Sequence, residues 1–318
     1  MDRRQFLAGA ATFPLALRFG SQALADGRAV ALVTADTQAR VAVIDLSTGK
    51  ILRSIATAAG PRSIESVNGN AAVVCHTAHG VVTLIESSLQ TRRVVGDFKE
   101  PGYTAAAANG RHAFVTDSGR HEVVTVDVLR AQVVARVALG GPARHVSLAP
   151  DNKSLWVSLG SKAEEVAVLD VSKPLKPRLV RKFHPPFRAH DVGFAPGGHR
   201  VWLSSGDRRA LALYESRTGR LLTQLRADAP PQHITFTRSN AYVTSGDDGT
   251  LRVLSLDGRE LRMTKVPRGS YNVQRASDRI LTPSLDEGTL CILDTHGSLL
   301  HRLQVAPSSH DACVLLAA

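Results

Sequence analysis

The sequence lacks long apolar runs beyond its N-terminus: no stretch reaches the roughly 18 residues that a membrane-spanning helix needs. Aromatic residues are scarce, at 5% of the 318 residues, and charged residues make up 21%. The hydrophobic fraction of 43% is typical of a soluble globular chain. These values exclude a multi-span membrane protein and predict either one large core or two ordinary domains.

Sequence motifs of several enzyme classes are also missing. The chain contains no G-x-S-x-G elbow, P-loop, dinucleotide fingerprint or H-E-x-x-H motif. Its cysteines, Cys75, Cys291 and Cys313, have no C-x-x-C or zinc-type spacing. Two of them could pair in an exported protein, but we favour the interpretation that they are small buried residues on strands. Whether the protein is an enzyme stays open at this point.

The net charge of +11 comes mostly from arginine. Such a balance can indicate nucleic acid, anionic lipid or an acidic partner. However, the chain has no long block of like charges and no basic helix with interleaved aromatic residues. We therefore expect arginines spread over the surface, and no nucleic-acid partner.

The N-terminus has the features of an export signal. Arg3 and Arg4 precede an apolar run at residues 8–17, and an Ala-Leu-Ala site at 23–25 precedes an acid. The arginine pair, followed by Phe and Leu, resembles a twin-arginine signal, which exports folded proteins. An aspartate before the pair and an arginine at the end of the apolar run depart from that pattern, so a Sec signal or an uncleaved anchor are the alternatives. We expect residues 1–25 to be a signal peptide, the protein to be periplasmic or extracellular, and the mature part to have no membrane span.

A unit of about 40 residues recurs along the rest of the chain, which is the signature of a repeat fold. Each unit opens with an apolar strand that ends in a small or hydroxyl residue. The copies of this strand are ALVTAD (31–36), AVVCHT (72–77), AFVTDS (113–118), LWVSLG (155–160), VWLSSG (201–206), AYVTSG (241–246) and ILTPSL (280–285). An alternating strand such as VAVIDLSTGK (41–50), a third strand, and a Gly/Pro corner leading to a fourth strand follow. Four short strands with period-two alternation predict one antiparallel propeller blade.

The C-terminus predicts how the ring closes. After the expected signal peptide, the first strand is of the first type (31–36), and residues 312–318, ACVLLAA, form an unpaired strand of the fourth type. This strand should complete the first blade, which removes the exposed edges of an open sheet. We therefore predict an all-β fold in which residues 26–318 form a single seven-bladed β-propeller, and we expect a monomer.

The repeated pattern resembles a known family. A strand ending in V-T or V-S, followed by V-x-V-(I/L/V)-D-x-x-(T/S)-G-(K/R), is similar to the YVTN family of β-propeller repeats, over nearly all of residues 29–318. The resemblance implies the fold but is a poor guide to function, because this fold carries many functions. Relatives of this kind include lactone-hydrolysing and haem-handling propellers.

The most informative constellation is a ring of polar residues at the start of the fourth strands. These strands should be innermost, so their first residues would meet at one mouth of the central channel. Counted back from the turn that ends each strand, the positions are Arg62, Tyr103, His145, His190 with Asp191, His233, Tyr271 with Asn272, and His310 with Asp311. Four of the 12 histidines fall at this position or beside it.

Several functions are compatible with this ring. Neutral imidazoles from separate blades, at His145, His190, His233 and His310, could bind a transition metal or a haem iron. The neighbouring aspartates could orient an imidazole or act with it as a general acid–base pair. The ring could equally bind a polar ligand, or be purely structural. A second, weaker metal candidate is Cys75-His76 with His79.

We retain two functional hypotheses. The first is an exported binding or scaffold module that presents the polar channel mouth to a small-molecule ligand or a periplasmic partner protein. The second is a metal- or haem-dependent periplasmic protein, either an oxidoreductase, a cofactor-handling protein or a lactonase-like enzyme, that uses the histidines of the channel mouth.

Overall fold

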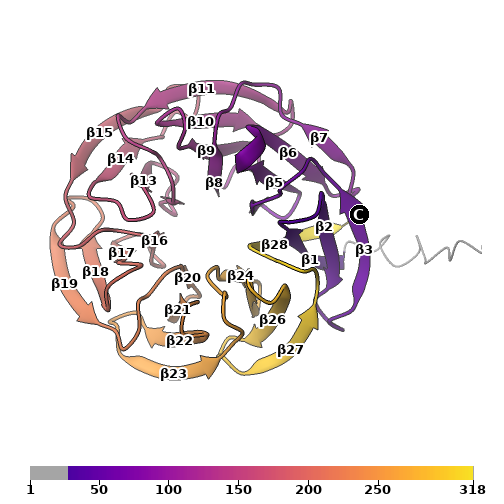
Figure 1. Cartoon of the computed structure of the whole chain (residues 1–318). Helices are drawn as coiled ribbons and strands as arrows, with labels where there is room; N and C mark the ends of the chain where they lie inside the picture. Colours follow the sequence, from indigo (N-terminus) through magenta and orange to yellow (C-terminus); the bar gives the residue numbers. More distant parts are fainter. Residues whose placement is uncertain (1–27, 318) are drawn as a thin grey trace, which may run out of the picture.

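The repeated strands form seven four-stranded antiparallel sheets, arranged as blades around a central axis (Figure 1). The computed structural model describes residues 28–317. The expected signal peptide, residues 1–25, lies outside the described residues. The prediction of an all-β, seven-bladed propeller is confirmed.

Each blade is ordered from its innermost to its outermost strand. Blade 1 contains β28 (Ala312–Ala317), β1 (Arg28–Ala35), β2 (Arg40–Asp45) and β3 (Ile51–Ala56). Blade 2 contains β4 (Ser63–Val67), β5 (Ala71–His76), β6 (Val81–Glu86) and β7 (Thr91–Arg93), with a short 3-10 helix at Thr77–His79. Blade 3 contains β8 (Pro101–Ala106), β9 (His112–Asp117), β10 (Glu122–Asp127) and β11 (Gln132–Ala138). Blade 4 contains β12 (Val146–Leu148), β13 (Ser154–Ser158), β14 (Val166–Asp170) and β15 (Arg178–Phe183).

The remaining three blades follow the same order. Blade 5 contains β16 (Val192–Phe194), β17 (Arg200–Ser204), β18 (Ala210–Glu215) and β19 (Leu221–Arg226). Blade 6 contains β20 (Ile234–Phe236), β21 (Asn240–Ser245), β22 (Thr250–Ser255) and β23 (Glu260–Lys265). Blade 7 contains β24 (Gln274–Ala276), β25 (Arg279–Pro283), β26 (Thr289–Asp294) and β27 (Leu299–Gln304). Among the residues described, no helix is long and apolar enough to cross a membrane.

The C-terminal strand closes the ring as predicted. β28 pairs antiparallel with β1, from Arg28 opposite Ala317 to Val33 opposite Ala312. Residues from the two ends of the described chain therefore share one sheet, and the first blade has the same four strands as the others.

The apolar core lies between the blades. Seven clusters of buried apolar side chains occur, and each combines residues of two adjacent blades. The two middle strands of a blade are buried on both faces because each face packs against a neighbouring blade, as the fully buried β5 shows. The outermost strands, such as β19, are mostly exposed. Cys75, Cys291 and Cys313 are all free and buried in this core.

The hydroxyl residue that ends each first-type strand has a structural role. The Thr116 hydroxyl donates to the Arg144 carbonyl at 2.7 Å, and the Ser158 hydroxyl donates to the His190 carbonyl at 3.0 Å. Both bonds join one blade to the chain entering the inner strand of the next blade. In blade 2 the position is Cys75, and the hydroxyl of Ser63 bonds the Gly102 carbonyl instead. The repeated Thr or Ser thus fixes the backbone beside the channel-mouth residues.

Candidate functional site

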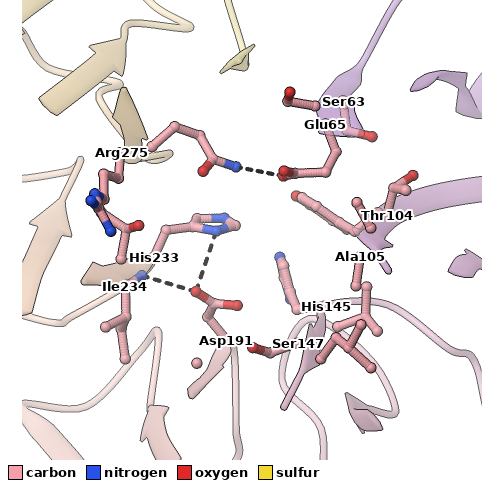
Figure 2. Close-up of a pocket in the computed structure, with 18 of the residues that line it drawn as sticks. Ser63, Glu65, Thr104, Ala105, His145, Ser147, Asp191, His233, Ile234 and Arg275 are labelled. Carbon is pink, nitrogen blue, oxygen red and sulfur yellow. Dashed lines mark hydrogen bonds and ion pairs between the residues drawn. The ribbon is translucent and has the colours of Figure 1, made fainter. Parts of the chain in front are cut away.

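The inner strands of blades 2 to 7, together with Asp311 just before the inner strand of blade 1, line one cavity of about 480 Å³ (Figure 2). This volume lies in the range of about 300–1,000 Å³ that is typical of small-molecule pockets. Its lining includes side chains from the polar ring that the sequence predicted, among them Tyr103, His145, Asp191 and His233.

Backbone pairing fixes which residues are equivalent in the ring. The amide of each strand-ending hydroxyl residue donates to a carbonyl of the inner strand: Ser158 to His145, Ser204 to Asp191, Thr244 to His233 and Thr34 to Asp311. In blade 2 the same position, opposite Cys75, is taken by Ser63.

The sequence-based register was therefore wrong by one residue in blade 2, where Arg62 precedes the ring position. The cause is the turn type. Asn68 and Gly69, both at positive φ, directly follow the strand-ending Val67, whereas in blade 3 the turn asparagine comes one residue later. Counting back from the asparagine shifted the register. His190, Tyr271 and His310 also lie one residue before the ring position.

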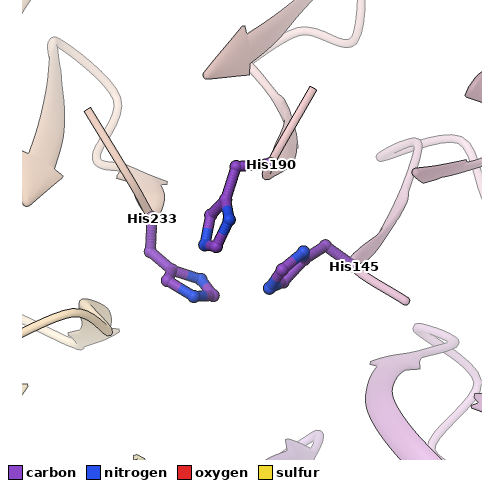
Figure 3. Close-up of side chains that lie close together, drawn as sticks. All are labelled: His145, His190 and His233. Carbon is purple, nitrogen blue, oxygen red and sulfur yellow. The ribbon is translucent and has the colours of Figure 1, made fainter. Parts of the chain in front are cut away.

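The structure brings three of the four candidate histidines together. Ligand atoms of His145, His190 and His233 all lie within 4.8 Å of one another, as Figure 3 shows. This is the single group of potential metal ligands within residues 28–317. His310 is not part of the group. Its Nδ1 lies 2.9 Å from the Arg62 carbonyl and 3.1 Å from the Asn272 amide.

The surroundings leave nitrogen atoms of this group free to bind a ligand. His190 Nδ1 lies 2.9 Å from the Ser161 carbonyl and must donate to it, which leaves Nε2 unprotonated in the neutral ring. His233 Nδ1 lies 3.6 Å from the Asp191 carboxylate. His145 is only 1% exposed, yet neither of its ring nitrogens has a hydrogen-bond partner. Buried polar atoms are normally bonded, so both nitrogens of His145 are available to a ligand.

Burial keeps these imidazoles neutral. Desolvation lowers the pKa of His190 to about 4, and it lowers the pKa of His145 and His233 well below the usual value. The neighbouring histidines and Arg144 lower the pKa of His145 and His233 further. Desolvation likewise lowers the pKa of His310 to about 3. A neutral imidazole is the form that coordinates a metal.

The two ring aspartates join adjacent inner strands. Asp191 accepts the amides of Val192 at 2.8 Å and Ile234 at 2.9 Å. Asp311 makes the equivalent bonds to the amides of Ala312 at 2.9 Å and Ile64 at 3.0 Å. Burial raises the pKa of Asp191 to about 7 and that of Asp311 well above the usual value. Both residues thus have a structural role, and Asp191 also faces His233.

The other predicted ring residues surround the histidines. The Tyr103 ring lies 4.2 Å from the His145 ring, and burial raises the pKa of Tyr103 to about 12. Arg62 pairs with Asp36 at 2.8 Å. The Tyr271 hydroxyl lies 3.0 Å from the Asp247 carboxylate, in a turn of blade 6. Tyr271 therefore contacts this turn, while Asn272 takes the ring position.

Sequence reasoning missed two charged residues near the ring. Arg144 directly precedes His145. Glu65, two residues after Ser63, accepts a bond of 2.9 Å from the Gln274 amide across the channel (Figure 2). Period-two alternation along the inner strand could have identified Glu65 as a channel residue.

The second metal candidate, Cys75-His76 with His79, does not form a group of converging ligand atoms among the described residues. Both ring nitrogens of His76 are already bonded, at 3.0 Å to the Ala59 carbonyl and 3.0 Å to the Thr83 hydroxyl. The Cys75 thiol lies 3.7 Å from the Thr104 hydroxyl, and burial raises its pKa to about 11. The contacts of His76 lie within blade 2 and the loop that leads into it, and the contact of Cys75 joins blade 2 to blade 3.

Comparison with known proteins identifies the fold but no family. No family model matches the chain. A stretch of 156 residues is 23% identical to protein NirF of Stutzerimonas stutzeri, covering 49% of this chain and 39% of that protein. The match thus spans well under two thirds of the relative's length.

Two solved structures share the propeller. A functionally unknown protein from Desulfotomaculum acetoxidans superposes with a TM-score of 0.77 at 14% identity, covering 91% of this chain and 99% of that one. The dihydro-heme d1 dehydrogenase NirN in complex with DHE superposes with a TM-score of 0.64 at 17% identity, covering 94% and 67%. At these identities the likeness establishes the fold alone.

Proposed function

We propose that this protein is an exported β-propeller that binds a transition-metal ion at its channel mouth through His145, His190 and His233. One observation carries the proposal: His145 is buried with both ring nitrogens unbonded, beside two imidazoles whose ligand atoms lie within 4.8 Å. Neutral imidazole nitrogens suit zinc, copper, nickel and iron.

The spacing is compatible with one ion. For zinc–nitrogen bonds of about 2.0–2.1 Å in a tetrahedral site, neighbouring nitrogens would lie about 3.4 Å apart. Small side-chain rotations would bring the three ligand atoms from their present spread to that separation. The proposed site has three protein ligands, which leaves a fourth position for water or a bound ligand, as in catalytic rather than structural zinc sites.

The residues around the histidines would support the ion. Asp191 faces His233 Nδ1, so its carboxylate would accept a hydrogen bond from Nδ1–H and direct the other nitrogen toward the ion. The Ser161 carbonyl does the same for His190. When bound, the ion would supply Lewis acidity at the open position.

Metal titration of the purified, metal-stripped mature protein tests the proposal. We expect one equivalent of Zn²⁺ or Cu²⁺ to bind by isothermal calorimetry, and His145→Ala to weaken this binding by about a hundredfold or more, since one of three ligands is lost. His310→Ala is the matched control, because His310 is also buried at the mouth but lies outside the group of three histidines.

The metal affinity of a variant is interpreted only if its thermal melting curve stays cooperative, which shows that the variant is folded. Stoichiometric binding that survives in His145→Ala, or a wild-type protein that takes up no metal, would refute the metal site.

A second candidate ligand is a metal-bearing tetrapyrrole, favoured by the likeness to NirN, a structure in complex with DHE. His145 or His233 would then hold the iron of the tetrapyrrole through its imidazole. Haemin titration separates the two ligands: a saturable shift of the main absorption band that disappears in His145→Ala and His233→Ala favours the tetrapyrrole. An unshifted band leaves the bare ion as the ligand.

Export is part of the proposal and depends on residues 1–25. The arginine pair and the Ala-Leu-Ala site support it. Cell fractionation tests it, with the expectation that the protein is found outside the cytoplasm and lacks residues 1–25.

A further inference from the structure

Arg144 places an uncompensated positive charge beside the histidine group. Its guanidinium lies over the Tyr103 ring, with Cζ 5.8 Å from the ring centroid, and the Tyr103 ring lies 4.2 Å from the His145 ring. The Arg144 Nε is buried and has no hydrogen-bond partner among the described residues. Stacking on an aromatic face uses none of the N–H donors of a guanidinium, so the buried Nε–H stays without an acceptor.

Arg62 occupies the equivalent position in blade 2, and its guanidinium has a carboxylate partner. The Arg62 amide bonds the Cys75 carbonyl at 2.9 Å, and the Arg144 amide bonds the Ser158 carbonyl at 3.0 Å, so both precede the ring by one residue. Arg62 pairs with the Asp36 carboxylate at 2.8 Å. No carboxylate in the described part of the chain forms such a pair with Arg144.

The charges around the proposed ion do not balance. A divalent cation on three neutral imidazoles keeps its full charge, and Arg144 adds another positive charge nearby. Asp191, whose carboxylate lies 3.6 Å from His233 Nδ1, supplies at most one negative charge against these three and also accepts two backbone amides. The exposed Asp207 and Asp247 act on His190 from a distance, and neither forms an ion pair with Arg144. Excess charge of one sign is costly in a partly buried site unless a counter-charge accompanies it.

We propose that the ligand of this site is an oxyanion, a carboxylate or a phosphate, that occupies the open metal position and pairs with Arg144. This inference rests on the proposed function. The planar guanidinium matches the two oxygens of a carboxylate or phosphate, and such charge-assisted pairs are among the stronger hydrogen bonds. The tyrosine beneath Arg144 would hold the guanidinium in place.

Co²⁺ is the probe for the experiment, because its visible absorption reports its coordination. The metal-stripped mature protein is loaded with Co²⁺ and titrated separately with acetate and with inorganic phosphate. We expect at least one of the two anions to change the cobalt spectrum saturably. In Arg144→Gln the anion should bind about tenfold or more weakly, since a charge-assisted bond is lost. Binding of Co²⁺ itself should be unchanged or tighter, because a repelling charge is removed.

Arg62→Gln is the matched comparison, because that guanidinium already has a carboxylate partner. We expect anion affinity in Arg62→Gln to stay within about threefold of wild type, well short of a lost charge-assisted bond. The anion that binds more tightly identifies the ligand class. A cobalt spectrum that neither anion changes, or an equal anion affinity in Arg144→Gln and wild type, overturns this inference while leaving the metal site intact. Failure of the wild-type protein to bind Co²⁺ instead overturns the proposed function.

Discussion

Glu65 carries a carboxyl group whose surroundings oppose its ionisation. Burial raises its pKa from 4.5 to about 7, and the bond from Gln274 offsets only part of this effect. The folded state therefore binds a proton more tightly than the unfolded state. The stability this provides is complete below about pH 4.5 and is lost as the pH rises through about 7.

We expect Glu65→Gln to remove this pH dependence, because the glutamine stays neutral and can still accept the Gln274 bond. Relative to this variant, the metal-free wild type should lose on the order of 3 kcal/mol of unfolding free energy between pH 4.5 and pH 8. Urea denaturation at several pH values measures the difference. Glu164→Gln, at an exposed residue, controls for the loss of a surface carboxylate. A Glu65→Gln protein that is no more stable than wild type at pH 8 would contradict the assignment.

At the same scale, the sequence could locate the ring but not its chemistry. The spacing between repeats placed His145 and His233 at equivalent positions, because one residue per blade faces the same mouth. Pattern alone could not show that His310 is bonded by Arg62 and Asn272 while His145 has no partner. Such differences depend on side-chain rotamers and on which carbonyls lie within reach, and these vary between blades that share one pattern.

The strand-ending hydroxyls act at the scale of the element. The Thr116 hydroxyl on β9 accepts the Tyr103 amide at 2.9 Å and donates to the Arg144 carbonyl at 2.7 Å. Thr125 on the neighbouring β10 is also buried, but its hydroxyl has no partner. Both threonines are buried, but only the hydroxyl of Thr116 is hydrogen-bonded. Comparing substitutions at the two positions therefore separates the effect of the hydrogen bonds from that of burial.

Replacement by valine, which has nearly the same shape, isolates the hydroxyl. We expect Thr116→Val to lower the free energy of unfolding by about 1–3 kcal/mol, because it leaves a buried amide and a carbonyl without their partner. Thr125→Val should leave stability unchanged or raise it slightly, since an unpaired buried hydroxyl is removed. Thermal and chemical denaturation measure both variants. Equal losses in the two proteins would show that the Thr116 bonds contribute nothing beyond packing.

The sequence largely predicted where the strands begin and end, but it did not predict the register shift between the second and third strands of a blade. The alternating strand expected at 41–50 begins within one residue of β2, and its terminal acid, Asp45, marks the turn. The register shift between the second and third strands, for example between Val43 and Ile44, gave no signal. Such a shift leaves the alternation of each strand intact, and only the pairing between strands reveals it.

At the scale of the molecule, the repeat fixes the number of blades. Each unit has too little apolar surface to fold alone, so its two faces are buried by its neighbours, and the seven inter-blade clusters are the result. The ring closes for the same reason: without its fourth strand, the first blade would expose a sheet edge and the apolar clusters on both of its faces. The lining of the channel was less predictable, since it depends on how far each inner strand extends toward the axis.

The closing strand carries the last prediction. β28 pairs with β1 along its length, and it supplies Cys313, Leu315 and Ala317 to the cluster between blades 1 and 2 and Ala312 to the cluster between blades 7 and 1. Deleting residues 312–318 would therefore remove one strand from a sheet and open two cores at once. We expect the truncated protein to show no cooperative thermal transition.

A circular permutant separates the contribution of the strand from that of chain continuity. Ala317 lies opposite Arg28 in the antiparallel pair, so residues 309–317 can be joined by a short turn to the front of residue 28, with the chain ending at residue 308. The permutant keeps every inter-blade contact of β28 but loses the link that joins blade 7 to blade 1. We expect it to fold with a cooperative transition at a lower temperature than wild type, because closure then depends on packing alone. If the truncated protein melts as the wild type does, the ring does not need its C-terminal strand. If the permutant fails to fold while the wild type does, continuity of the chain rather than strand pairing closes the propeller.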